Sequence, residues 1–468
     1  MGGARDLDIL LAHGYFLSED AQERRIMRPY PPLGLLYLSS HLKRAGFAVE
    51  VFDSTFRPFS ELEAIIQRQR PPVVGIYSNL MTKRNVLRIV ELARRAGCAV
   101  VLGGPDPPHH AEEYLAYGAD AVVVGEGEKT LEDLVPEILV RPRERDWGSI
   151  PGLVFRAGGE LQRTAPRPLI ANLDGQPPPD RDAVDIPAYL DAWRRAHGRG
   201  SISLITARGC PYTCTWCSRS VFGETHRRRS VAAVADEVQG LVERYRPEQV
   251  WYADDVFGIH RGWTLDFADE IGRRGLRVPF ECISRAERID ADVADALARL
   301  GCYRVWIGSE SGSQRVLDAM QRRVGVAQVQ EATRRIQARG IEVGYFIMLG
   351  YDDEGPSDLE ETVRHLKEAR PDTFLTTVAY PIKGTPYYTA VEDRIAHDRD
   401  WTETSDRELR VRGSHTPDYY RWVRRWMTAE VDRERHWREG RFVRAARAAA
   451  IAGAGRLGMR LHAQRRVS

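Results

Sequence analysis

The chain has 468 residues, of which 43% are hydrophobic, so it is long enough for two or three cores rather than one. Its 68 basic and 66 acidic residues nearly cancel, which argues against a nucleic-acid partner and favours small molecules. No apolar run approaches the roughly 20 residues that span a bilayer, and the start, Met1-Gly-Gly-Ala-Arg-Asp6, lacks the apolar stretch of a secretory signal, so we expect a cytoplasmic protein with no membrane partner.

From Asp6 to about Leu139, short apolar runs alternate with helical stretches. Five runs are predicted strands: Leu7–Ala12, Ala48–Asp53, Val73–Tyr77, Ala99–Leu102 and Ala121–Val124. Their spacing predicts an open, doubly wound parallel sheet of the Rossmann-like type within residues 1–140. Ligands of such sheets bind at the carboxyl ends of the strands, where glycines and hydroxyls allow close approach. The candidate contacts are Ser78, Thr82, Gly103, Gly104, Gly125 and Glu126.

Residues 141–200 break this alternation with eight prolines, at 142, 151, 166, 168, 177, 178, 179 and 187. Prolines restrict the backbone and interrupt regular elements. We therefore expect a linker, with one hairpin around Gly158-Gly159.

A second alternating series occupies residues 201–390. Its predicted strands are Ile202–Thr206, Gln249–Ala253, Pro279–Ser284, Tyr303–Gly308, Val343–Met348 and Phe374–Tyr380. Intervening stretches such as Val231–Tyr245 and Ser357–Ala369 have helical periodicity. Six such units predict a partial parallel (β/α)6 barrel, whose chemistry lies at the carboxyl ends of its strands.

The C-terminal region, residues 391–468, is charged and predicted to be helical. From Arg441 to Ser468 it contains seven arginines and no acidic residue. We interpret this stretch as a basic amphipathic helix with a frayed end. The alternative is a surface for an acidic partner or a membrane.

Three of the six cysteines lie close together, in Arg208-Gly-Cys-Pro-Tyr-Thr-Cys-Thr-Trp-Cys217. In this C-x3-C-x2-C spacing, three thiolates on one loop can each hold one iron of a cubane. The fourth iron is then open to bind and reduce a substrate. The alternatives are a zinc site, which usually has four ligands in two pairs, and chance clustering. The isolated Cys98, Cys282 and Cys302 are interpreted as small core residues.

This cysteine loop after a first strand resembles the radical S-adenosylmethionine (SAM) superfamily, and the resemblance covers about Ser201 to Tyr388. It implies a [4Fe–4S] cluster on Cys210, Cys214 and Cys217, and reductive cleavage of SAM to a 5′-deoxyadenosyl radical. Trp216 is similar to the family residue that lies near the adenine. Asp254 and Asp255 occupy the motif that receives the methionine amino group, although it reads Ala-Asp-Asp here instead of Gly-Gly-Glu.

Further SAM contacts are implied at the ends of later strands. Arg285 is placed to pair with the SAM carboxylate, or else to form an ion pair with Glu281 or Glu287. Glu310 is placed to accept hydrogen bonds from ribose hydroxyls or the amino group. The segment Ile347 to Glu354 resembles the adenine-contacting fifth-strand segment, and its apolar half is equally explained as core.

The front domain, followed by this barrel, resembles the radical SAM subclass with an N-terminal cobalamin (B12)-binding domain. The matching stretches are Pro31-Pro-Leu-Gly-Leu-Leu-Tyr37, Gly103-Gly-Pro105, Gly125-Glu-Gly-Glu128 and Pro177-Pro-Pro-Asp-Arg181. The Asp-x-His-x-x-Gly cobalt-ligating motif is absent, so His13, His41, His109 and His110 are not assigned as axial ligands. The resemblance implies bound cobalamin, or a domain that has kept the fold and lost the cofactor.

These features leave three hypotheses for the function. The first is cobalamin-dependent C-methylation of a small molecule, such as an intermediate of antibiotic biosynthesis. The second is radical dehydration of a diol in an amino sugar by a lyase, with a separate reductase. The third is a non-catalytic iron–sulfur protein. Either enzyme needs a one-electron reductant of the flavodoxin or ferredoxin type, and its substrate contacts are expected to include Tyr380, Lys383 and Tyr387.

Overall fold

The structure is a computed structural model that describes residues 7–141, 146–351, 353–396 and 399–468. The sequence start at Met1–Asp6, Pro142 and Asp352 therefore lie outside the described residues. The described residues within Met1–Pro211, Ser218–Ala253 and Arg399–Arg407 form a first compact unit. Those within Tyr212–Cys217, Asp254–Asp398 and Glu408–Ser468 form a second unit.

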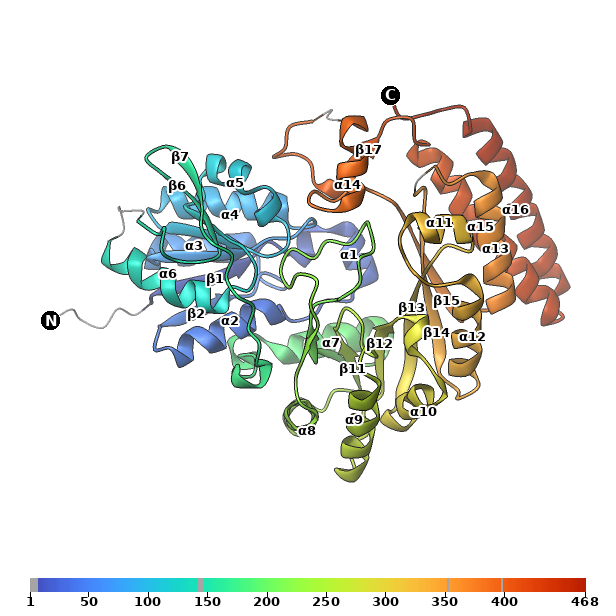
Figure 1. Ribbon diagram of the computed structural model, residues 1–468, viewed down its shortest axis with the longest axis horizontal. Helices are drawn as coiled ribbons and strands as arrows, with labels where there is room; N and C mark the ends of the chain where they lie inside the picture. Colours follow the sequence, from blue (N-terminus) through green and yellow to red (C-terminus); the bar gives the residue numbers. More distant parts are fainter. Residues whose placement is uncertain (1–6, 142–145, 352, 397–398) are drawn as a thin grey trace. The chain divides into compact units, whose positions relative to one another are not determined.

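The first unit contains a seven-stranded sheet in the order β2-β1-β3-β4-β5-β6-β7 (Figure 1). Strand β1 pairs in parallel with both β2 and β3, and β3, β4 and β5 continue the parallel ladder. The bounds are β1 Ile9–His13, β2 Val49–Phe52, β3 Val73–Tyr77, β4 Ala99–Gly103, β5 Ala121–Val123, β6 Leu153–Ala157 and β7 Glu160–Arg163. The five predicted strands thus form the predicted doubly wound sheet.

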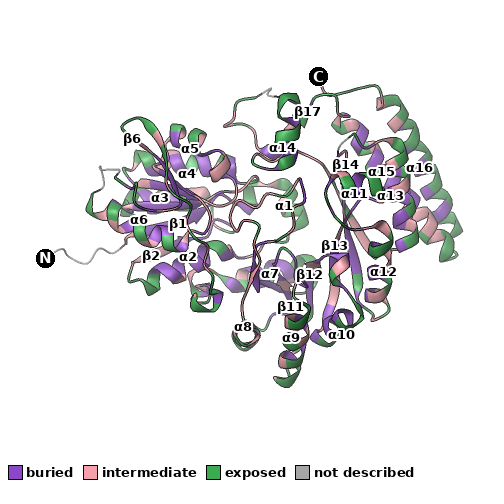
Figure 2. Cartoon of the chain, in the orientation of Figure 1, coloured by how far each residue is buried: buried purple, intermediate pink, exposed green. Residues whose placement is uncertain are grey.

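The sheet is buried on both faces because its strands are apolar throughout. In β1, Leu10 and Ala12 belong to one hydrophobic cluster, and Ile9 and Leu11 belong to another. Successive side chains of a strand point to opposite faces, so the two clusters lie on opposite sides of the sheet. Helices α3 (Phe59–Gln69), α4 (Lys83–Arg95) and α5 (Ala111–Tyr117) supply the first cluster. Helices α2 (Leu33–Arg44) and α6 (Glu128–Val140) supply the second (Figure 2).

The proline-rich stretch is more ordered than its composition predicts. The expected hairpin at Gly158-Gly159 is present, and its strand β6 pairs antiparallel with β5, so the hairpin extends the first sheet. Helix α7 (Ile186–His197) was not predicted. Asp185 caps it by accepting a hydrogen bond from Ala188 N at 3.0 Å, and Pro187 occupies its first turn, where a proline is compatible with a helix.

The remaining elements of the first unit lead to the cysteine loop. Strands β8 (Ser201–Leu204) and β11 (Gln249–Tyr252) pair in parallel. Two short strands, β9 (Ala207–Arg208) and β10 (Arg227–Arg228), pair antiparallel and form a stem at the two ends of residues 209–226. This unit also contains helices α1 (Ala21–Ile26) and α8 (Val231–Tyr245). Helix α8 has the bounds that its periodicity predicts.

The second unit contains four parallel strands that pair in chain order from β12 to β15. Their bounds are β12 Phe280–Ser284, β13 Cys302–Glu310, β14 Glu342–Leu349 and β15 Thr373–Val378. Helices α9 (Arg261–Arg273), α10 (Ala291–Leu300), α11 (Gln314–Ala319), α12 (Val326–Gln337) and α13 (Pro356–Ala369) alternate with them. With β8 and β11 of the first unit, all six strands predicted for the partial barrel are formed.

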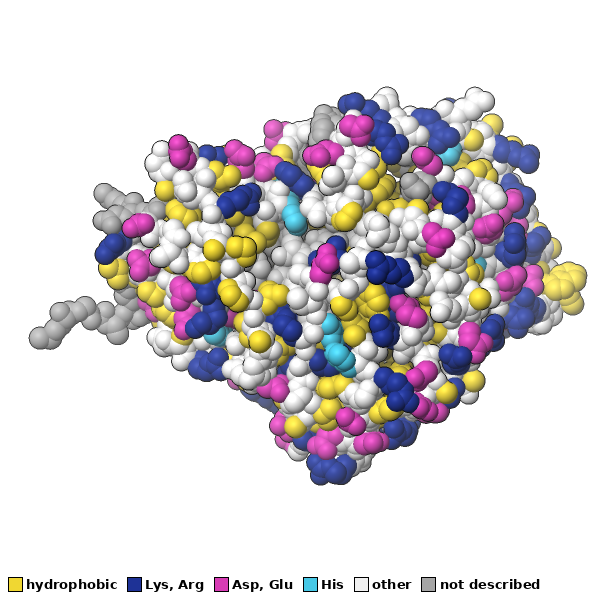
Figure 3. Space-filling view, in the orientation of Figure 1, with side chains coloured by type: hydrophobic (Ala, Val, Ile, Leu, Met, Phe, Trp, Pro, Cys, Tyr) yellow, Lys and Arg dark blue, Asp and Glu magenta, His cyan; other side chains and the backbone are white. Residues whose placement is uncertain are grey.

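The chain ends in a pair of long helices, α15 (Pro417–Arg438) and α16 (Phe442–His462), preceded by α14 (Pro386–Val391) and the short strands β16 (Ile395–Ala396) and β17 (Arg410–Val411). Small residues let α16 pack closely on α15, because a Cβ added at Gly455 would lie 2.8 Å from Trp426 Cβ. Arginine side chains lie along the outer side of this pair (Figure 3). The predicted basic helix is therefore present as α16, and a partner for it stays a prediction. Among the described helices, none is long and apolar enough to cross a bilayer.

Candidate active site

The three clustered cysteines lie between the stem strands β9 and β10. Cys210 is half-buried, Cys214 is buried and Cys217 is exposed, and Cys217 N donates to Cys214 O at 3.3 Å. None of the six cysteines, all of which are described, forms a disulfide. In the described part of the chain, no three His, Cys, Asp or Glu side chains are grouped so that they could together bind one metal ion. Each thiolate of a cubane binds a different iron, so the three need not converge on one point.

Gly209, directly before the first of these cysteines, has a backbone conformation that requires glycine. Its φ is +88°, and a Cβ added there would overlap the carbonyl oxygen of Thr225. The overlapping atom belongs to the backbone of Thr225, so movement of a flexible side chain cannot relieve the overlap. Gly209 therefore sets the direction in which the cysteine loop leaves β9.

Replacing Gly209 with alanine is expected to reduce the iron content of the purified protein and to lower its Tm, because the positive φ and the overlap with Thr225 both oppose a side chain. Gly223→Ala is the matched control. Gly223 has a φ of +62°, and its added Cβ meets nothing nearer than Leu169 Cδ1 at 3.9 Å. Equal iron loss in both variants would show that the overlap at Gly209 is unimportant.

Two guanidinium groups surround the sulfur of Cys214. Arg285 Nη1 lies 3.4 Å from Cys214 Sγ and Arg322 Nη1 lies 3.6 Å from it. Both arginines are buried, and they place two positive charges beside this sulfur. Arg322 Nε is also buried, with no hydrogen-bond partner among the described residues, as is Thr213 Oγ1 beside Cys214. A thiolate-ligated, negatively charged cluster fits these surroundings.

Arg322 is a candidate that the sequence did not indicate. It follows α11 in a turn in which Gln321 and Arg323 both have positive φ. Its Nη2 donates to the carbonyl oxygen of Gly308, and its guanidinium lies 5.9 Å from the centre of the Trp216 ring. Arginines are common on the surface, and nothing local distinguishes Arg322 from its neighbours. Only the fold brings it to a cysteine 108 positions earlier.

Arg285 is held by several partners at once. It forms an ion pair with Glu287 through Nε, donates through Nη2 to the carbonyl oxygen of Arg322, and lies 3.7 Å from the centre of the Tyr212 ring. Of the two ion pairs considered as alternatives, the one with Glu287 is formed. This pair leaves Nη1 directed at Cys214. A role for Arg285 with the SAM carboxylate stays a prediction.

Glu310, the last residue of β13, is both buried and strained. Its φ is +60°, and the register between β13 and β14 shifts between Gly308 and Glu310. Non-glycine residues adopt this conformation at a cost, and such strain is concentrated at functional sites. Burial raises the pKa of Glu310, and the nearby Arg322 and Arg285 act in the opposite direction. The bulge thus holds a carboxyl group beside the two guanidinium groups, as an acceptor for a ligand requires.

Asp254 and Asp255 follow β11, where the family motif was expected. Asp254 is buried, with 2% of its surface exposed, whereas the side chain of Asp255 is exposed. The protein around Asp255 and the charge of Asp254 both raise the pKa of the Asp255 carboxyl. Contact of Asp254 and Asp255 with the methionine amino group stays a prediction.

Trp216 packs into a cluster of large side chains in the second unit. Its ring lies 6.4 Å from that of Tyr351 in an edge-on arrangement, and Tyr351 in turn lies 4.5 Å from the ring of Tyr387. Tyr387 N donates to Thr215 O at 2.9 Å. These contacts tie the cysteine loop to the segment after β15. They favour a packing role for Tyr387 over the predicted substrate contact, while the parts of Tyr380 and Lys383 stay predictions.

The segment Ile347–Glu354 divides into an apolar strand end and a polar turn. Ile347 is buried in β14, and Glu354 accepts a hydrogen bond from Gly350 N at 2.6 Å. Burial raises the pKa of Glu354 to about 8. Asp352 within this segment lies outside the described residues. An adenine contact by its backbone stays a prediction.

The candidate cofactor residues of the front domain lie at the carboxyl ends of β3, β4 and β5, as predicted. Ser78 is fully buried, and its Oγ lies 3.0 Å from Tyr114 OH. Thr82, at the start of α4, has its Oγ1 3.1 Å from Asn79 N. A Cβ added at Gly104, whose φ is +104°, would overlap Ser78 O. Ser78, Thr82 and Gly104 thus shape this edge of the sheet through contacts within the protein.

Gly103 and Gly125 are less closely approached at the same edge. A Cβ added at Gly103 would meet nothing nearer than Val123 Cβ at 3.9 Å, and one at Gly125 nothing nearer than Val221 O at 3.8 Å. An added Cβ would thus make only ordinary van der Waals contacts at either position, and a glycine without a side chain keeps the backbone within reach of a polar ligand. The residues at this edge therefore fit a bound cofactor of the cobalamin type, with Gly103 and Gly125 as the candidate contacts.

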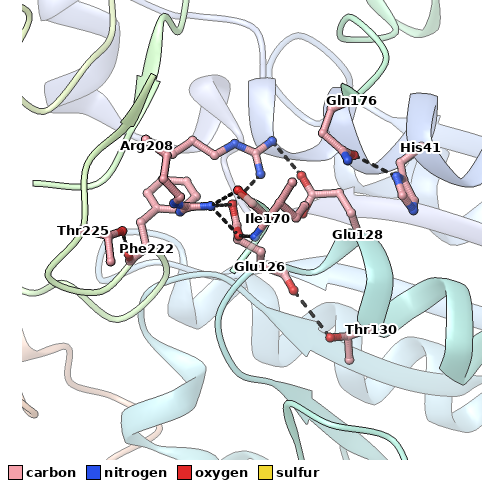
Figure 4. A network of polar contacts seen from close by, with 10 residues as sticks. His41, Glu126, Glu128, Thr130, Ile170, Gln176, Arg208, Phe222 and Thr225 are labelled. Carbon is pink, nitrogen blue, oxygen red and sulfur yellow. Dashed lines mark hydrogen bonds and ion pairs between the residues drawn. The ribbon is translucent and has the colours of Figure 1, made fainter. Parts of the chain in front are cut away.

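Glu126 has a different environment from the one that the sequence suggested. Its carboxylate is buried and accepts from Arg208 Nη1 at 2.7 Å, from Arg227 Nη1 at 2.8 Å and from Ile170 N at 2.7 Å (Figure 4). Both of its oxygens are therefore engaged by protein donors. A direct cofactor contact for Glu126 stays a prediction, and the geometry assigns it a structural role first.

Comparisons with known proteins agree with the two domains. The sequence model of the Radical SAM superfamily matches residues 204–366, and that of the B12 binding domain matches residues 26–135. An uncharacterized methyltransferase of Pyrococcus horikoshii is 30% identical over 375 residues, which cover 79% of this chain and 80% of that protein. The anaerobic magnesium-protoporphyrin IX monomethyl ester cyclase of Cereibacter sphaeroides is 27% identical over 403 residues, covering 83% of this chain and 64% of that enzyme.

One solved structure supports the fold over most of the chain. The radical S-adenosylmethionine methyltransferase TsrM from Kitasatospora setae, solved with cobalamin and a [4Fe-4S] cluster, superposes with a TM-score of 0.68. The superposition covers 82% of this chain and 74% of that one at 22% sequence identity. At this identity the likeness concerns the fold.

Proposed function

Because the chain belongs to the radical SAM superfamily, in the subclass with an N-terminal B12-binding domain, we propose that it transfers a methyl group to a carbon atom of a small-molecule substrate. It is a radical SAM enzyme whose cofactors are a [4Fe–4S] cluster, SAM and cobalamin. A cluster held by Cys210, Cys214 and Cys217 would supply the electron for reductive cleavage of SAM to a 5′-deoxyadenosyl radical, and bound cobalamin would supply a carrier of methyl groups.

The observation that supports this proposal most strongly is the environment of Cys214. Cys214 is buried, with Arg285 Nη1 and Arg322 Nη1 at 3.4 and 3.6 Å from its sulfur, so a negatively charged iron–sulfur cluster bound there would have two positive neighbours. Cys210 and Cys217 complete the C-x3-C-x2-C loop. We assign all three as cluster ligands.

The residues around Cys214 provide a site for a zwitterionic, hydroxyl-bearing ligand such as SAM. Arg322 and Arg285 offer positive charge for a carboxylate, and Glu310 offers an acceptor for ribose hydroxyls or an ammonium group. Trp216 offers an aromatic face. Each of these groups is fixed by packing or hydrogen bonds before a ligand arrives, which lowers the entropic cost of binding.

Methyl transfer is favoured over the dehydration alternative by the match of residues 26–135 to the B12 binding domain. A dehydratase of the second hypothesis would not use that cofactor. The name of the Pyrococcus horikoshii relative, a methyltransferase, points the same way. The substrate is proposed to be a small molecule, and the electron donor a one-electron reductant of the flavodoxin or ferredoxin type.

Anaerobic purification is expected to yield protein with the absorption of both a corrin and an iron–sulfur cluster. Reduced protein given SAM and a methyl acceptor should release two products from SAM, namely S-adenosylhomocysteine and 5′-deoxyadenosine. Corrin extraction and chromatography of the products provide the measurement. Release of 5′-deoxyadenosine from corrin-free protein, with loss of water from a diol substrate, would instead establish the lyase.

A further inference from the structure

The loop that carries all three cysteines is closed at its base by two arginines. Arg208 ends β9 and Arg227 begins β10, and the two are opposite each other in the antiparallel pair. Arg208 directly precedes Gly209 and Cys210, and Arg227 follows the end of the loop at residue 226. The positions of these two side chains therefore fix where the loop begins and ends.

Both arginines bind the same carboxylate of the front domain. Glu126 accepts from Arg208 Nη1 at 2.7 Å through Oε1, and from Arg227 Nη1 at 2.8 Å through Oε2. Glu128, two residues later, forms an ion pair with Arg208 Nη2 at 2.7 Å. Figure 4 shows Arg208 extended between the two acidic side chains. Two carboxylates and two guanidinium groups thus form one connected group, which we call the Glu126 clamp.

The Glu126 clamp is buried, so each of its charges must stay close to its partner. The side chains of Glu126, Glu128 and Arg208 are exposed by only 4%, 6% and 8%. Burial alone would lower the pKa of Arg208, but the carboxylates of Glu128 and Glu126 outweigh this effect and raise it. Buried ion pairs contribute little net stability, since desolvation offsets their attraction, whereas removal of one partner is costly. Buried ion pairs contribute more to conformational specificity, because they favour the one arrangement of the chain in which every charge is paired.

The later part of the loop makes one further contact with the same edge of the front sheet. Ser220 Oγ donates to Pro105 O at 2.8 Å, in the segment that follows β4. The Glu126 clamp and this hydrogen bond therefore join the cysteine loop to the edge that carries the candidate cofactor residues Gly103 and Gly125.

We propose that Glu126 and Glu128 are positioning residues for the iron–sulfur cluster, which hold the base of the cysteine loop in register with the cofactor edge of the front domain. This inference rests on the proposed function, because it assumes that the cysteines bind the cluster. Neither carboxylate touches a cysteine. Both act through Arg208, and Glu126 also acts through Arg227.

Full-length Glu126→Gln, which keeps the shape and removes the charge, is expected to bind iron but to show an altered EPR spectrum of the reduced cluster. Its midpoint potential should shift, and its rate of 5′-deoxyadenosine formation should fall about tenfold or more, because displacement of reacting groups by about 1 Å can cost a factor of roughly 100. Glu126→Asp keeps the charge but shortens the reach, so it should restore part of the rate.

The matched control is Glu430→Gln, which breaks a partly buried ion pair with Lys367 in the second unit. It should change Tm to a similar extent and leave the EPR spectrum and potential unchanged. Wild-type spectrum and potential in Glu126→Gln would overturn the positioning role. If Glu126→Gln does not fold, Arg208→Lys provides the same comparison, and a wild-type EPR spectrum there would equally refute the clamp. Absence of any cluster in the wild-type protein would refute the proposed function instead.

Discussion

Replacing any one of Cys210, Cys214 and Cys217 with alanine is expected to remove most of the bound iron and to abolish SAM cleavage. Each thiolate is assigned to a different iron, and a cubane that lacks one of three protein ligands is held too weakly to survive purification. The largest loss is expected for Cys214→Ala, because it also leaves Arg285 and Arg322 buried without their sulfur acceptor. Iron analysis and the EPR spectrum of the reduced protein provide the measurement.

Cys98→Ala is the matched control for these variants. Cys98 is buried before β4 in the first unit and lies outside the cysteine loop, and burial raises the pKa of its thiol to about 11, so it is not poised as a thiolate. Its removal should leave iron content and SAM cleavage unchanged. Equal iron loss in Cys98→Ala and Cys217→Ala would contradict the assignment of the ligands to one loop.

Glu310→Gln is expected to weaken SAM binding by about 10- to 100-fold, since a hydrogen bond to a charged group contributes roughly 1.5–3 kcal/mol. The substitution keeps the size of the side chain and the unusual backbone at the end of β13, so the fold should survive. Equilibrium dialysis with SAM, or calorimetry on the protein with its cluster, measures the change. The iron content should stay at the wild-type value.

Glu342→Gln is the matched control, which tests whether loss of any carboxylate in this sheet weakens SAM binding. Glu342 begins β14 and forms an ion pair with Arg304 at 2.5 Å in which the Glu342 side chain is 48% exposed. Exposed pairs contribute about 0–1 kcal/mol, so SAM affinity and Tm should change little. Unchanged SAM affinity in Glu310→Gln would remove Glu310 from the binding site and leave its strained backbone without a functional reason.

The strands could be predicted from the sequence because they are short and buried on both faces. The runs at Val73–Tyr77 and Ala121–Val124 are apolar throughout, as in parallel sheets, and the structure places their ends within a residue or two of the prediction. Helix α8 followed from its periodicity alone. Helix α7 was missed because Pro187 was interpreted as part of a linker, although a proline in the first turn is compatible with a helix.

Contacts between residues distant in sequence could not be predicted in the same way. Residues 399–407 belong to the first unit, where the Trp401 ring lies 4.8 Å from that of Tyr114 and the Lys83 ammonium lies 4.5 Å from the Trp401 ring. Nothing in a charged, tryptophan-bearing segment near the chain end indicates that packing. Local patterns report which face of an element is apolar, but not which distant segment covers it.

In the candidate site, too, local features could be predicted from the sequence, whereas contacts between distant residues could not. The cysteine spacing identified the loop because its ligands are close in sequence, whereas Arg322 reaches Cys214 only through the turn after α11. Glu126 was identified as a polar residue at a ligand-binding edge, and its position is as predicted. Its two arginine partners lie 82 and 101 residues later, so its engagement with them required the structure.

The central claim is that a cluster on Cys210, Cys214 and Cys217 cleaves SAM reductively. The most direct measurement is the formation of 5′-deoxyadenosine by anaerobically reconstituted, reduced protein given SAM, compared with the variant in which all three cysteines are alanine. We predict that the wild-type protein forms 5′-deoxyadenosine and that the triple variant forms none above the reductant alone. Formation of 5′-deoxyadenosine by the triple variant at the wild-type rate would contradict the claim.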